Sequence, residues 1–447
     1  MSKQIIVIGG GPAGVEAALT AARAGAGVTL VSETPIGGRA GWASLVPSQV
    51  WLHAADTFGI IQAAGIVGIA LDGAAKPDAQ AVVARIRQVA KGWNGQLAEQ
   101  LKQAGVTVLT GVAALASPTS VSIEANGETT ELTADAIIVA AGSVPVFPPA
   151  MRPDGKRVLA PRFASKLDTL PASVVVVGAG ATGVEFAYLF NRLGVQVTWI
   201  VSEKGVLPMF AEGAGDFVAQ VLAKRGVNVV GGQRAAAVDA DDDGVTVTLA
   251  DGTIHRADMA FLAVGRRADV SRLGIEAAGL TPGPKGELVI DEFGRTSVPT
   301  IYAAGDVTGL PMLANQATAQ AWVAASHAAG ASTAQPYRPE TVVHAVFSEP
   351  QVAQVGRFDK ASVSTKLAYA AGLKAHLLGD AEGYIELHYE RTSRLIQGGV
   401  AVGPHAVDAV APIAMAIRMG ASVEDLAGPS GGYPSVSELA FAVAKEA

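Results

Sequence analysis

The stretch Ile5–Gly14, IIVIGGGPAG, constrains the fold of this chain more than any other segment. Four apolar residues predict a buried strand, and Gly9, Gly11 and Gly14 follow at GxGxxG spacing, before apolar residues that recur at helical spacing. In this context the first glycine permits a tight turn, the second a close approach to a pyrophosphate, and the third close packing of helix on strand. The helix N-terminus then offers free N–H groups to phosphates. We therefore predict a dinucleotide-binding turn.

The same pattern returns in the middle of the chain, between residues 173 and 203. Gly178, Gly180 and Gly183 repeat the spacing after the apolar run VVVV, and a second helix and strand follow them. Two nucleotide-binding modules in one chain imply two nucleotides held together. The simplest chemical reason for that arrangement is electron transfer between them.

The strand after the first helix, Gly27–Glu33, ends where an acidic residue normally accepts a hydrogen bond from a ribose hydroxyl. Ser32 stands at the usual place of the acid and Glu33 follows it, and either side chain can bond a ribose. The alternative is that Glu33 is a solvated loop charge.

Composition excludes several classes of function. A chain of 447 residues suggests about three domains. With 50% hydrophobic and 16% charged residues it can build a large core, and its net charge of -7 without a basic block argues against nucleic acid. No apolar run is long enough for a membrane span, and the apolar start is too short for a signal peptide, so we expect a cytoplasmic protein. The absence of cysteine excludes disulfides, thiolate nucleophiles and thiolate metal sites, and no metal site is predicted.

Further elements can be placed by periodicity and turn residues. Helices are expected at 80–104, 313–329, 407–419 and 439–444, hairpins around 126–127 and 241–244, and buried strands within 136–145 and 300–309. Residues 332–340 are polar with two prolines, which indicates a boundary. The remainder, 341–447, has no nucleotide motif and fits an α+β domain.

In their order along the whole chain, these motifs resemble the flavoprotein disulfide reductases, the family of dihydrolipoamide dehydrogenase, glutathione reductase and mercuric reductase. The resemblance rests on GGGPAG, the GG-to-PS segment, AAGSVP, GAGATG, AVGRR, AAGDVTG and YPSVSE. It implies an α/β protein with two Rossmann-like dinucleotide-binding domains and a C-terminal α+β dimerisation domain. The implied boundaries are 1–150 and 271–340 for FAD, 151–270 for NAD(P), and 341–447 for a homodimer interface.

The resemblance also implies cofactor-binding residues. In the FAD-binding domain the first glycine loop and Arg39 would lie along the pyrophosphate, Ala113 would meet the adenine, Gly142 would line the FAD cleft, and Asp306 would hydrogen-bond the ribityl chain. The positions expected to bind FAD are Gly9, Gly11, Pro12, Ala13, Gly14, Ser32, Glu33, Gly38, Arg39, Ser48, Ala113, Ala141, Gly142, Gly305, Asp306, Leu313 and Ala314. Those expected to bind the nicotinamide nucleotide are Gly178, Gly180, Gly183, Glu185, Glu203 and Gly265.

The departures from the family are equally informative. Ala40 and Leu45 stand where the family has its two redox-active cysteines. Gln49 replaces a lysine that pairs with a glutamate near the flavin, and Tyr433 replaces the C-terminal histidine, while Glu438 remains. A tyrosine, with an ordinary pKa near 10, is a poor base at neutral pH. These consistent losses exclude disulfide reduction.

Several residues near these losses have two interpretations. Trp42 can cover the flavin or stack on a planar acceptor, or it can simply fill the space of the lost dithiol, and Trp51 lies beside the same segment. Tyr433 can line an acceptor cleft across a dimer interface or be inert packing. Glu438 can have a structural role alone. Gln49, Tyr433 and Glu438 are retained as the candidate catalytic positions.

The favoured function is an FAD-dependent NAD(P)H oxidoreductase that passes electrons to a quinone, metal ion, oxygen, nicotinamide or protein carrier; soluble transhydrogenases and some quinone reductases are precedents within the family. One alternative is a binding or assembly protein that keeps FAD without turnover. Another is a specialised flavoenzyme acting on a small organic substrate in the vacated dithiol space.

The nicotinamide preference is predicted from the end of the second module's second strand. An acid there favours NADH and arginines favour NADPH. Glu203 is present and arginines are absent, so NADH is expected over NADPH. Against this, Glu203 lies beyond Val201, where the family acid stands, and Lys204 can reach a phosphate.

Overall fold

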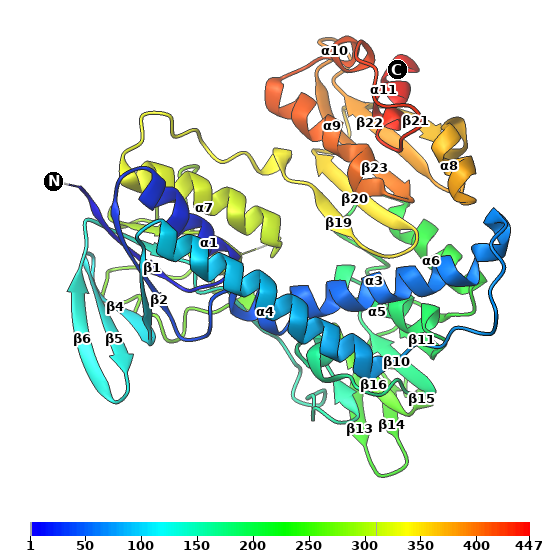
Figure 1. Ribbon diagram of the computed structural model, residues 1–447, viewed down its shortest axis with the longest axis horizontal. Coiled ribbons are helices and arrows are strands. Elements are labelled where there is room, and N and C mark those ends of the chain that lie inside the picture. Colours follow the sequence, from blue (N-terminus) through cyan, green and yellow to red (C-terminus); the bar gives the residue numbers. More distant parts are fainter. Residues whose placement is uncertain (1, 310) are drawn as a thin grey trace. The chain divides into compact units, whose positions relative to one another are not determined.

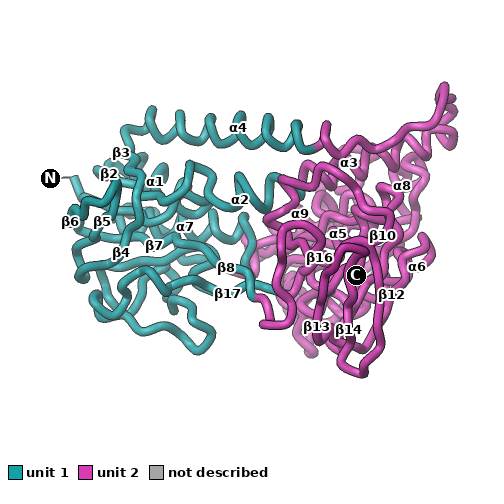
Figure 2. The backbone as a smooth tube through the Cα atoms, turned by 90° about the horizontal axis from the view of Figure 1, so that it is seen from below, with its two compact units in different colours: residues 1–48, 83–146, 265–338 teal, residues 49–82, 147–264, 339–447 magenta. Residues whose placement is uncertain are grey.

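The computed structural model describes residues 2–309 and 311–447. The chain divides into two compact units (Figure 2). Unit 1 comprises residues 1–48, 83–146 and 265–338, and unit 2 comprises residues 49–82, 147–264 and 339–447. Each unit therefore draws on three separated segments of the chain and contains one of the two glycine loops.

Unit 1 is built on a parallel sheet with the strand order β18-β7-β1-β2-β3, of which β1 and β2 are labelled in Figure 1. These strands are β1 (Gln4–Ile8), β2 (Gly27–Ser32), β3 (Thr107–Thr110), β7 (Ala136–Val139) and β18 (Ile301–Ala303). Side chains alternate between the two faces of a strand, so Ile5 and Val7 enter one core while Ile6 and Ile8 enter another. Both faces of the sheet are thus covered.

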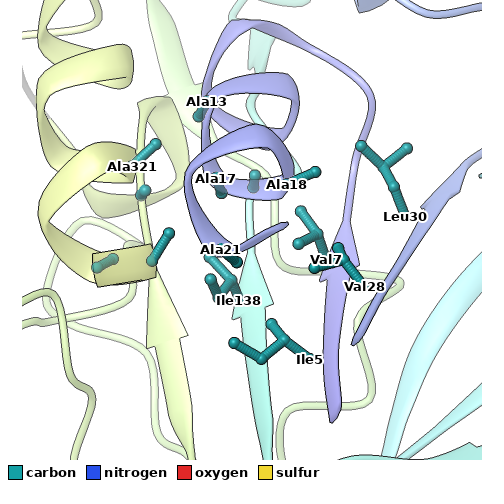
Figure 3. Close-up of a cluster of buried hydrophobic side chains, with 14 of the residues drawn as sticks. Ile5, Val7, Ala13, Ala17, Ala18, Ala21, Val28, Leu30, Ile138 and Ala321 are labelled. Atoms are coloured by element: carbon teal, nitrogen blue, oxygen red, sulfur yellow. The ribbon is translucent and has the colours of Figure 1, made fainter. Parts of the chain in front are cut away.

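Three helices contribute to the first of these cores: α1 (Pro12–Arg23), α4 (Ala79–Gln103) and α7 (Ala314–Ala329). Alanines dominate the contact between α1 and α7, among them Ala13, Ala17 and Ala321 (Figure 3). Small side chains let two helices pack closely beside the sheet. The predicted helix 80–104 is found one residue earlier, at 79–103, and the predicted helix 313–329 begins one residue later, at Ala314, and ends as predicted.

The second core of unit 1 lies under an antiparallel sheet of β4 (Val112–Ser117), β5 (Ser120–Ala125) and β6 (Glu128–Thr133). Asn126 and Gly127 have positive φ angles of 54° and 84°, as the tight hairpin between β5 and β6 requires. A small antiparallel ribbon pairs β8 (Ser143–Pro145) with β17 (Arg266–Ala268). The short helix α2 (Gly38–Trp42) and the start of α3 (Leu45–Gln62) complete this unit's N-terminal segment.

Unit 2 contains a second parallel sheet with the order β12-β11-β10-β16-β9. Its strands are β9 (Val158–Leu159), β10 (Ser173–Val177), β11 (Gln196–Ile200), β12 (Asn228–Val230) and β16 (Met259–Leu262). The helices α5 (Ala181–Arg192) and α6 (Ala214–Lys224) belong to it, with an antiparallel sheet of β13 (Ala235–Ala240), β14 (Val245–Leu249) and β15 (Ile254–Ala257). Phe186 of α5 stacks on Phe261 of β16, with ring centroids 3.9 Å apart.

The C-terminal part of unit 2 is an antiparallel sheet with the order β19-β20-β23-β22-β21, covered by helices. Its strands are β19 (His344–Val346), β20 (Gln351–Gly356), β21 (Val363–Ala368), β22 (Tyr384–Tyr389) and β23 (Ile396–Gly403). Its helices are α8 (Leu373–Leu378), α9 (Ala406–Met419), α10 (Val423–Ala427) and α11 (Glu438–Lys445). This is the α+β arrangement expected for residues 341–447.

Candidate functional site

The first glycine loop follows β1 in unit 1, and its three glycines meet different surroundings. Gly9 has a φ of 111°, and a Cβ there would lie 2.3 Å from the Ala140 carbonyl oxygen. A Cβ on Gly14 would lie 1.7 Å from the Gly9 carbonyl oxygen. A Cβ on Gly11, by contrast, would have no described protein atom within 4 Å. Packing within the protein explains Gly9 and Gly14, and it leaves open space at Gly11 for a ligand.

Helix α1 begins directly after this open position. Gly11 is its N-cap, Pro12 occupies the first turn with Ala13, and no described side chain caps the helix. No acidic residue stands in that first turn. The backbone N–H groups of a helix N-terminus attract anions, so the loop fits a pyrophosphate. Gly38, which has a φ of 55°, packs against Gly11 and bounds the loop there.

The second glycine loop reproduces this geometry in unit 2. A Cβ on Gly178 would lie 2.3 Å from the Ala263 carbonyl oxygen, and one on Gly183 would lie 2.0 Å from the Gly178 carbonyl oxygen. Gly180 again has no described neighbour within 4 Å. Both loops therefore have the shape of a phosphate cradle.

The strands beside the two loops end in equivalent glycines. After β7 the chain passes through Ala141 to Gly142, and after β16 it reaches Gly265. Both glycines have positive φ angles, 81° and 120°, and neither has a described atom within 4 Å of an added Cβ. Both glycines therefore occupy open, left-handed backbone positions.

A polar cluster of Arg39, Ser143, Arg266 and Asp306 lies in unit 1. The Ser143 hydroxyl donates to the Asp306 carboxylate at 2.5 Å, and the Arg39 guanidinium donates to the same carboxylate at 3.2 Å. Arg39 and Arg266 both donate to the Ser143 carbonyl oxygen, Arg266 at 2.6 Å. Burial is the main cause that lowers the pKa of Arg39, and Asp306 partly offsets it. The cluster holds the Asp306 side chain in place.

Sequence reasoning identified Arg39 and Asp306 but missed Ser143 and Arg266. The signal was available, since Ser143 directly follows Gly142 and Arg266 follows Gly265. Farther along the chain, Leu313 is the N-cap of α7 and Ala314 is its first residue. Gly305, with a φ of 81°, donates its N–H to the buried Gln320 side chain at 2.8 Å and so fixes the turn before Asp306.

The two candidates for the first ribose are both engaged within unit 1. The buried Ser32 hydroxyl donates to the Thr34 carbonyl oxygen at 2.7 Å. Glu33 accepts two hydrogen bonds from the Arg272 guanidinium, at 3.1 and 2.6 Å. That contact holds the pKa of Glu33 below its ordinary value. Ala113, the adenine candidate, lies in β4 and is buried.

The positions that replace the dithiol belong to two helices. Ala40 lies in α2, and Leu45 is the first residue of α3 and is 39% exposed. Trp42 is 37% exposed, and its indole N–H donates to the Ile36 carbonyl oxygen at 2.9 Å. The Ser48 hydroxyl is turned back to the Leu45 carbonyl oxygen.

Behind α2 lies Asn94 of α4, which is 2% exposed. Its amide has no hydrogen-bond partner within the described part of the chain. The amide oxygen would touch a Cβ on Gly37 or Gly41, so the α2 segment must be rich in glycine to fit against it.

In unit 2, Trp51 is fully buried and its indole N–H donates to the Ala164 carbonyl oxygen at 2.8 Å, which identifies it as a core residue. Gln49 is half-buried. Tyr433 is 75% exposed, and Glu438 is the first residue of α11. The described chain gives neither Tyr433 nor Glu438 a hydrogen-bond partner that would orient it for catalysis.

Two carboxylates accompany the second loop. Glu185, on α5, is buried and accepts a hydrogen bond from the Phe347 backbone N–H at 3.1 Å; burial raises its pKa to about 7. Glu203, beyond the end of β11, accepts from Arg234 at 2.8 Å, and this bond is the main cause that lowers its pKa.

Among residues 2–309 and 311–447, no group of three or more His, Cys, Asp or Glu residues could hold a metal ion. No helix there has the length and apolar character that a membrane crossing needs.

With this geometry in place, comparison with known proteins defines the class. Residues 3–321 match the family described as pyridine nucleotide-disulphide oxidoreductase, and residues 342–442 match its dimerisation domain. The chain belongs to the pyridine nucleotide-disulphide oxidoreductase family, whose members use FAD and NAD(P)H. The comparisons confirm the predicted family and the predicted α/β fold class. They also confirm the prediction of an NAD(P)H-dependent flavoprotein oxidoreductase without dithiol chemistry.

Individual relatives refine this placement. The chain is 34% identical over 455 residues to an NAD(P)H dehydrogenase (quinone) of Mycobacterium tuberculosis, covering 98% of this chain and 92% of that protein. It is 32% identical to a dihydrolipoyl dehydrogenase of Chlorobaculum tepidum, covering 97% and 94%. The crystal structure of LpdA from Mycobacterium tuberculosis superposes with a TM-score of 0.93, at 32% identity and 99% coverage of both chains.

The contrast between Gly11 and Gly14 predicts two different phenotypes. In Gly11→Ala the added methyl group has no atom of the described residues within 4 Å, so we expect the fold to be retained and bound FAD to be lost. In Gly14→Ala the methyl group clashes with the Gly9 carbonyl, and destabilisation of about 3 kcal/mol or more is expected. Flavin released on heating and the thermal unfolding midpoint measure the two effects. A Gly11→Ala protein that keeps its full FAD content would contradict the assignment.

Proposed function

We propose that this protein carries electrons from NADH through a bound FAD to a quinone. The observation that carries the proposal is the combination of two intact glycine cradles, each open at its second glycine, with a chain that contains no cysteine. Both nucleotide sites are kept while the thiol route for electrons is gone. An acceptor that needs no thiol must therefore take the electrons directly.

A quinone suits these conditions chemically. It takes up two electrons and two protons, and it requires neither a thiol nor a metal ion from the protein. The relative named NAD(P)H dehydrogenase (quinone), 34% identical across nearly the whole chain, supports this choice of acceptor. A metal ion, oxygen, a second nicotinamide or a protein carrier are the other acceptors to be compared with it.

Trp42 is the residue we assign to the quinone. Its indole N–H is already bonded to Ile36, and the side chain is partly exposed two residues after Ala40. An aromatic face left open beside a vacated reactive position is suited to stacking on a planar ring.

The proposal keeps the predicted division of labour along the chain. Residues 1–150 and 271–340 bind FAD, residues 151–270 bind the nicotinamide nucleotide, and residues 341–447 join two chains in a cytoplasmic homodimer. The match of residues 342–442 to a dimerisation domain supports the last assignment. The high exposure of Tyr433 is compatible with a place in the partner's site.

The acceptor is tested by mixing NADH-reduced protein anaerobically with each acceptor and following flavin reoxidation. We expect fast reoxidation by a soluble benzoquinone or naphthoquinone, and none by lipoamide or glutathione disulfide. Trp42→Ala should raise the quinone KM roughly tenfold, the loss of about one aromatic contact, with Trp42→Phe as the matched control. Alkylating reagents should have no effect.

Other outcomes of this experiment favour the alternatives. Protein that is never reduced by NADH or NADPH would support the binding or assembly interpretation. Protein that is reduced but not reoxidised by any of these acceptors would support a specialised flavoenzyme for a small organic substrate. Turnover of a disulfide would contradict the proposal.

The preference for NADH depends on the balance between Glu203 and Arg234. Glu203 repels a 2′-phosphate, but its ion pair with Arg234 places a guanidinium beside the same carboxylate. Arg234 lies on a loop that is held near the end of β11, because the Gln233 N–H donates to the Val201 carbonyl oxygen at 3.2 Å. Both side chains are exposed, so water screens their charges and the preference should be modest.

We expect NADH to reduce the flavin faster than NADPH at equal concentration. Glu203→Ala should shift the ratio roughly two- to fivefold toward NADPH, and Arg234→Ala should shift it by a similar factor toward NADH, as for exposed charges. Stopped-flow flavin absorbance gives both rates. Faster reduction by NADPH in the wild type would reject the preference, and unchanged ratios in both variants would reject the pair as its cause.

A further inference from the structure

A group of exposed aliphatic side chains follows helix α3 in unit 2. The run from Thr57 to Leu71 contains no charged residue. It covers the end of α3 and the short 3₁₀ helix η1 (Ala64–Val67). Its large aliphatic side chains that are 52–75% exposed are Ile60, Ile66, Val67, Ile69 and Leu71. Single exposed aliphatic residues are common on protein surfaces, but a concentration of them marks an interaction site.

Helix α8, in the same unit, extends this surface. Ile66 contacts the end of α8, because a Cβ on Gly379, the C-cap of that helix, would lie 3.5 Å from the Ile66 side chain. Figure 1 shows the segment after α3 reaching α8. Three leucines of α8 are 39–56% exposed. Together these side chains form what we call the apolar patch: Ile60, Ile66, Val67, Ile69, Leu71, Leu373, Leu377 and Leu378.

The end of α3 beneath the patch is fixed to the rest of unit 2. The Tyr188 hydroxyl donates to the Asp56 carboxylate at 2.5 Å. One turn further along α3, the guanidinium of Arg192 lies against Gly59, and Arg192 is paired with Glu349 at 2.9 Å. The patch therefore starts from an anchored helix, and a partner that docks on it has less chain to order on binding.

Two observations favour a second copy of this chain as the partner. Helix α8 lies within residues 342–442, which match a dimerisation domain, so the patch is continuous with a domain that pairs two chains. The patch also suits contact with itself. In a two-fold interface the same surface of both copies is used, and residues near the axis meet their own duplicates. Residues 57–71 bring no charge to such a contact, so no like charges would repel each other there.

A lipid surface is the other partner that an apolar patch suggests. Segments that lie on membranes typically combine aromatic anchors with lysines and arginines that face the headgroups. Residues 59–71 contain neither an aromatic nor a basic residue, and the whole chain carries a net charge of -7. The observations therefore favour the second copy over the membrane.

We propose that the apolar patch docks on a second copy of this chain, so that the homodimer interface includes residues 60–71 as well as the C-terminal domain. The inference extends the proposed function, which assigned pairing to residues 341–447 alone, and it rests on that function only in expecting a homodimer.

The dimer Kd of the FAD-loaded protein tests the proposal, measured by analytical ultracentrifugation over a dilution series. Ile66→Asp places a carboxylate where pairing would bury it, so the Kd should rise about 100-fold or more. Leu377→Asp should act in the same direction from α8. Ile254→Asp is the matched control, because Ile254 is 54% exposed on β15 and lies outside the patch. Its Kd should stay within about twofold of the wild type.

The absence of cysteine allows a second, independent measurement. A cysteine introduced by Leu71→Cys can carry a nitroxide label with no competing thiol in the chain. In the dimer, double electron–electron resonance should place the two labels within about 30 Å of each other, the width of a standard interface. This measurement serves if a charged variant does not fold, and labels that are farther apart would contradict the proposal.

The outcomes separate this inference from the proposed function. A Kd that stays unchanged in both Ile66→Asp and Leu377→Asp would overturn the docking of the patch and leave the homodimer standing. If Ile66→Asp instead abolishes flotation with phosphatidylethanolamine–phosphatidylglycerol vesicles while the dimer persists, the partner is a lipid surface and the inference falls. A wild-type protein that is monomeric at micromolar concentration would overturn both. Failure of the quinone to reoxidise the flavin would concern the proposed function alone.

Discussion

The structure depends on the close approach of each glycine loop to the backbone of a neighbouring strand. Gly9 lies against the Ala140 carbonyl and Gly178 against the Ala263 carbonyl, with no room for a side chain at either place. The third glycine of each loop then lets its helix start directly over the first. This packing aims the N-termini of α1 and α5 past Gly11 and Gly180, where the protein leaves space. Two phosphate cradles in one chain are the foundation for moving electrons between two nucleotides.

The remaining polar groups show what the loss of the dithiol leaves behind. Next to the vacated position at Ala40, Arg39 and Arg266 converge on Ser143, and Arg39 also meets Asp306. Two guanidiniums against one carboxylate give this cluster one net positive charge. Arginine is suited to such a partly buried place because it keeps its charge and donates in several directions. In unit 2, by contrast, the buried Glu185 accepts a hydrogen bond from the Phe347 backbone N–H and has no ion-pair partner among the described residues. The chain has therefore lost its thiol chemistry without losing charged groups in the modules that would hold the nucleotides.

Much of the fold could be predicted from the sequence because its signals are local. Apolar runs before glycine turns predicted β1 and β10, and the Asn126-Gly127 pair predicted the hairpin of β5 and β6.

The partners of polar side chains could not be predicted in the same way, since they come from distant parts of the chain. Glu33 binds Arg272, Arg39 binds Asp306, and Glu203 binds Arg234. Ser32 bonds to its own turn. Trp51, beside the altered segment in sequence, is buried in the core. Family resemblance named positions, but only the packing shows which side chains are already engaged.

We expect that the flavin takes electrons from a nicotinamide nucleotide and that no thiol of the protein accepts them in turn. An anaerobic titration of the FAD-loaded protein with NADH tests this claim most directly, with flavin absorbance as the readout. A protein with no dithiol stores two electrons per FAD, so bleaching should be complete at about one equivalent of NADH per flavin. It should also proceed without the long-wavelength band that a thiolate beside the flavin produces. A requirement for about two equivalents, or flavin that stays oxidised with NADH and NADPH alike, would contradict the account.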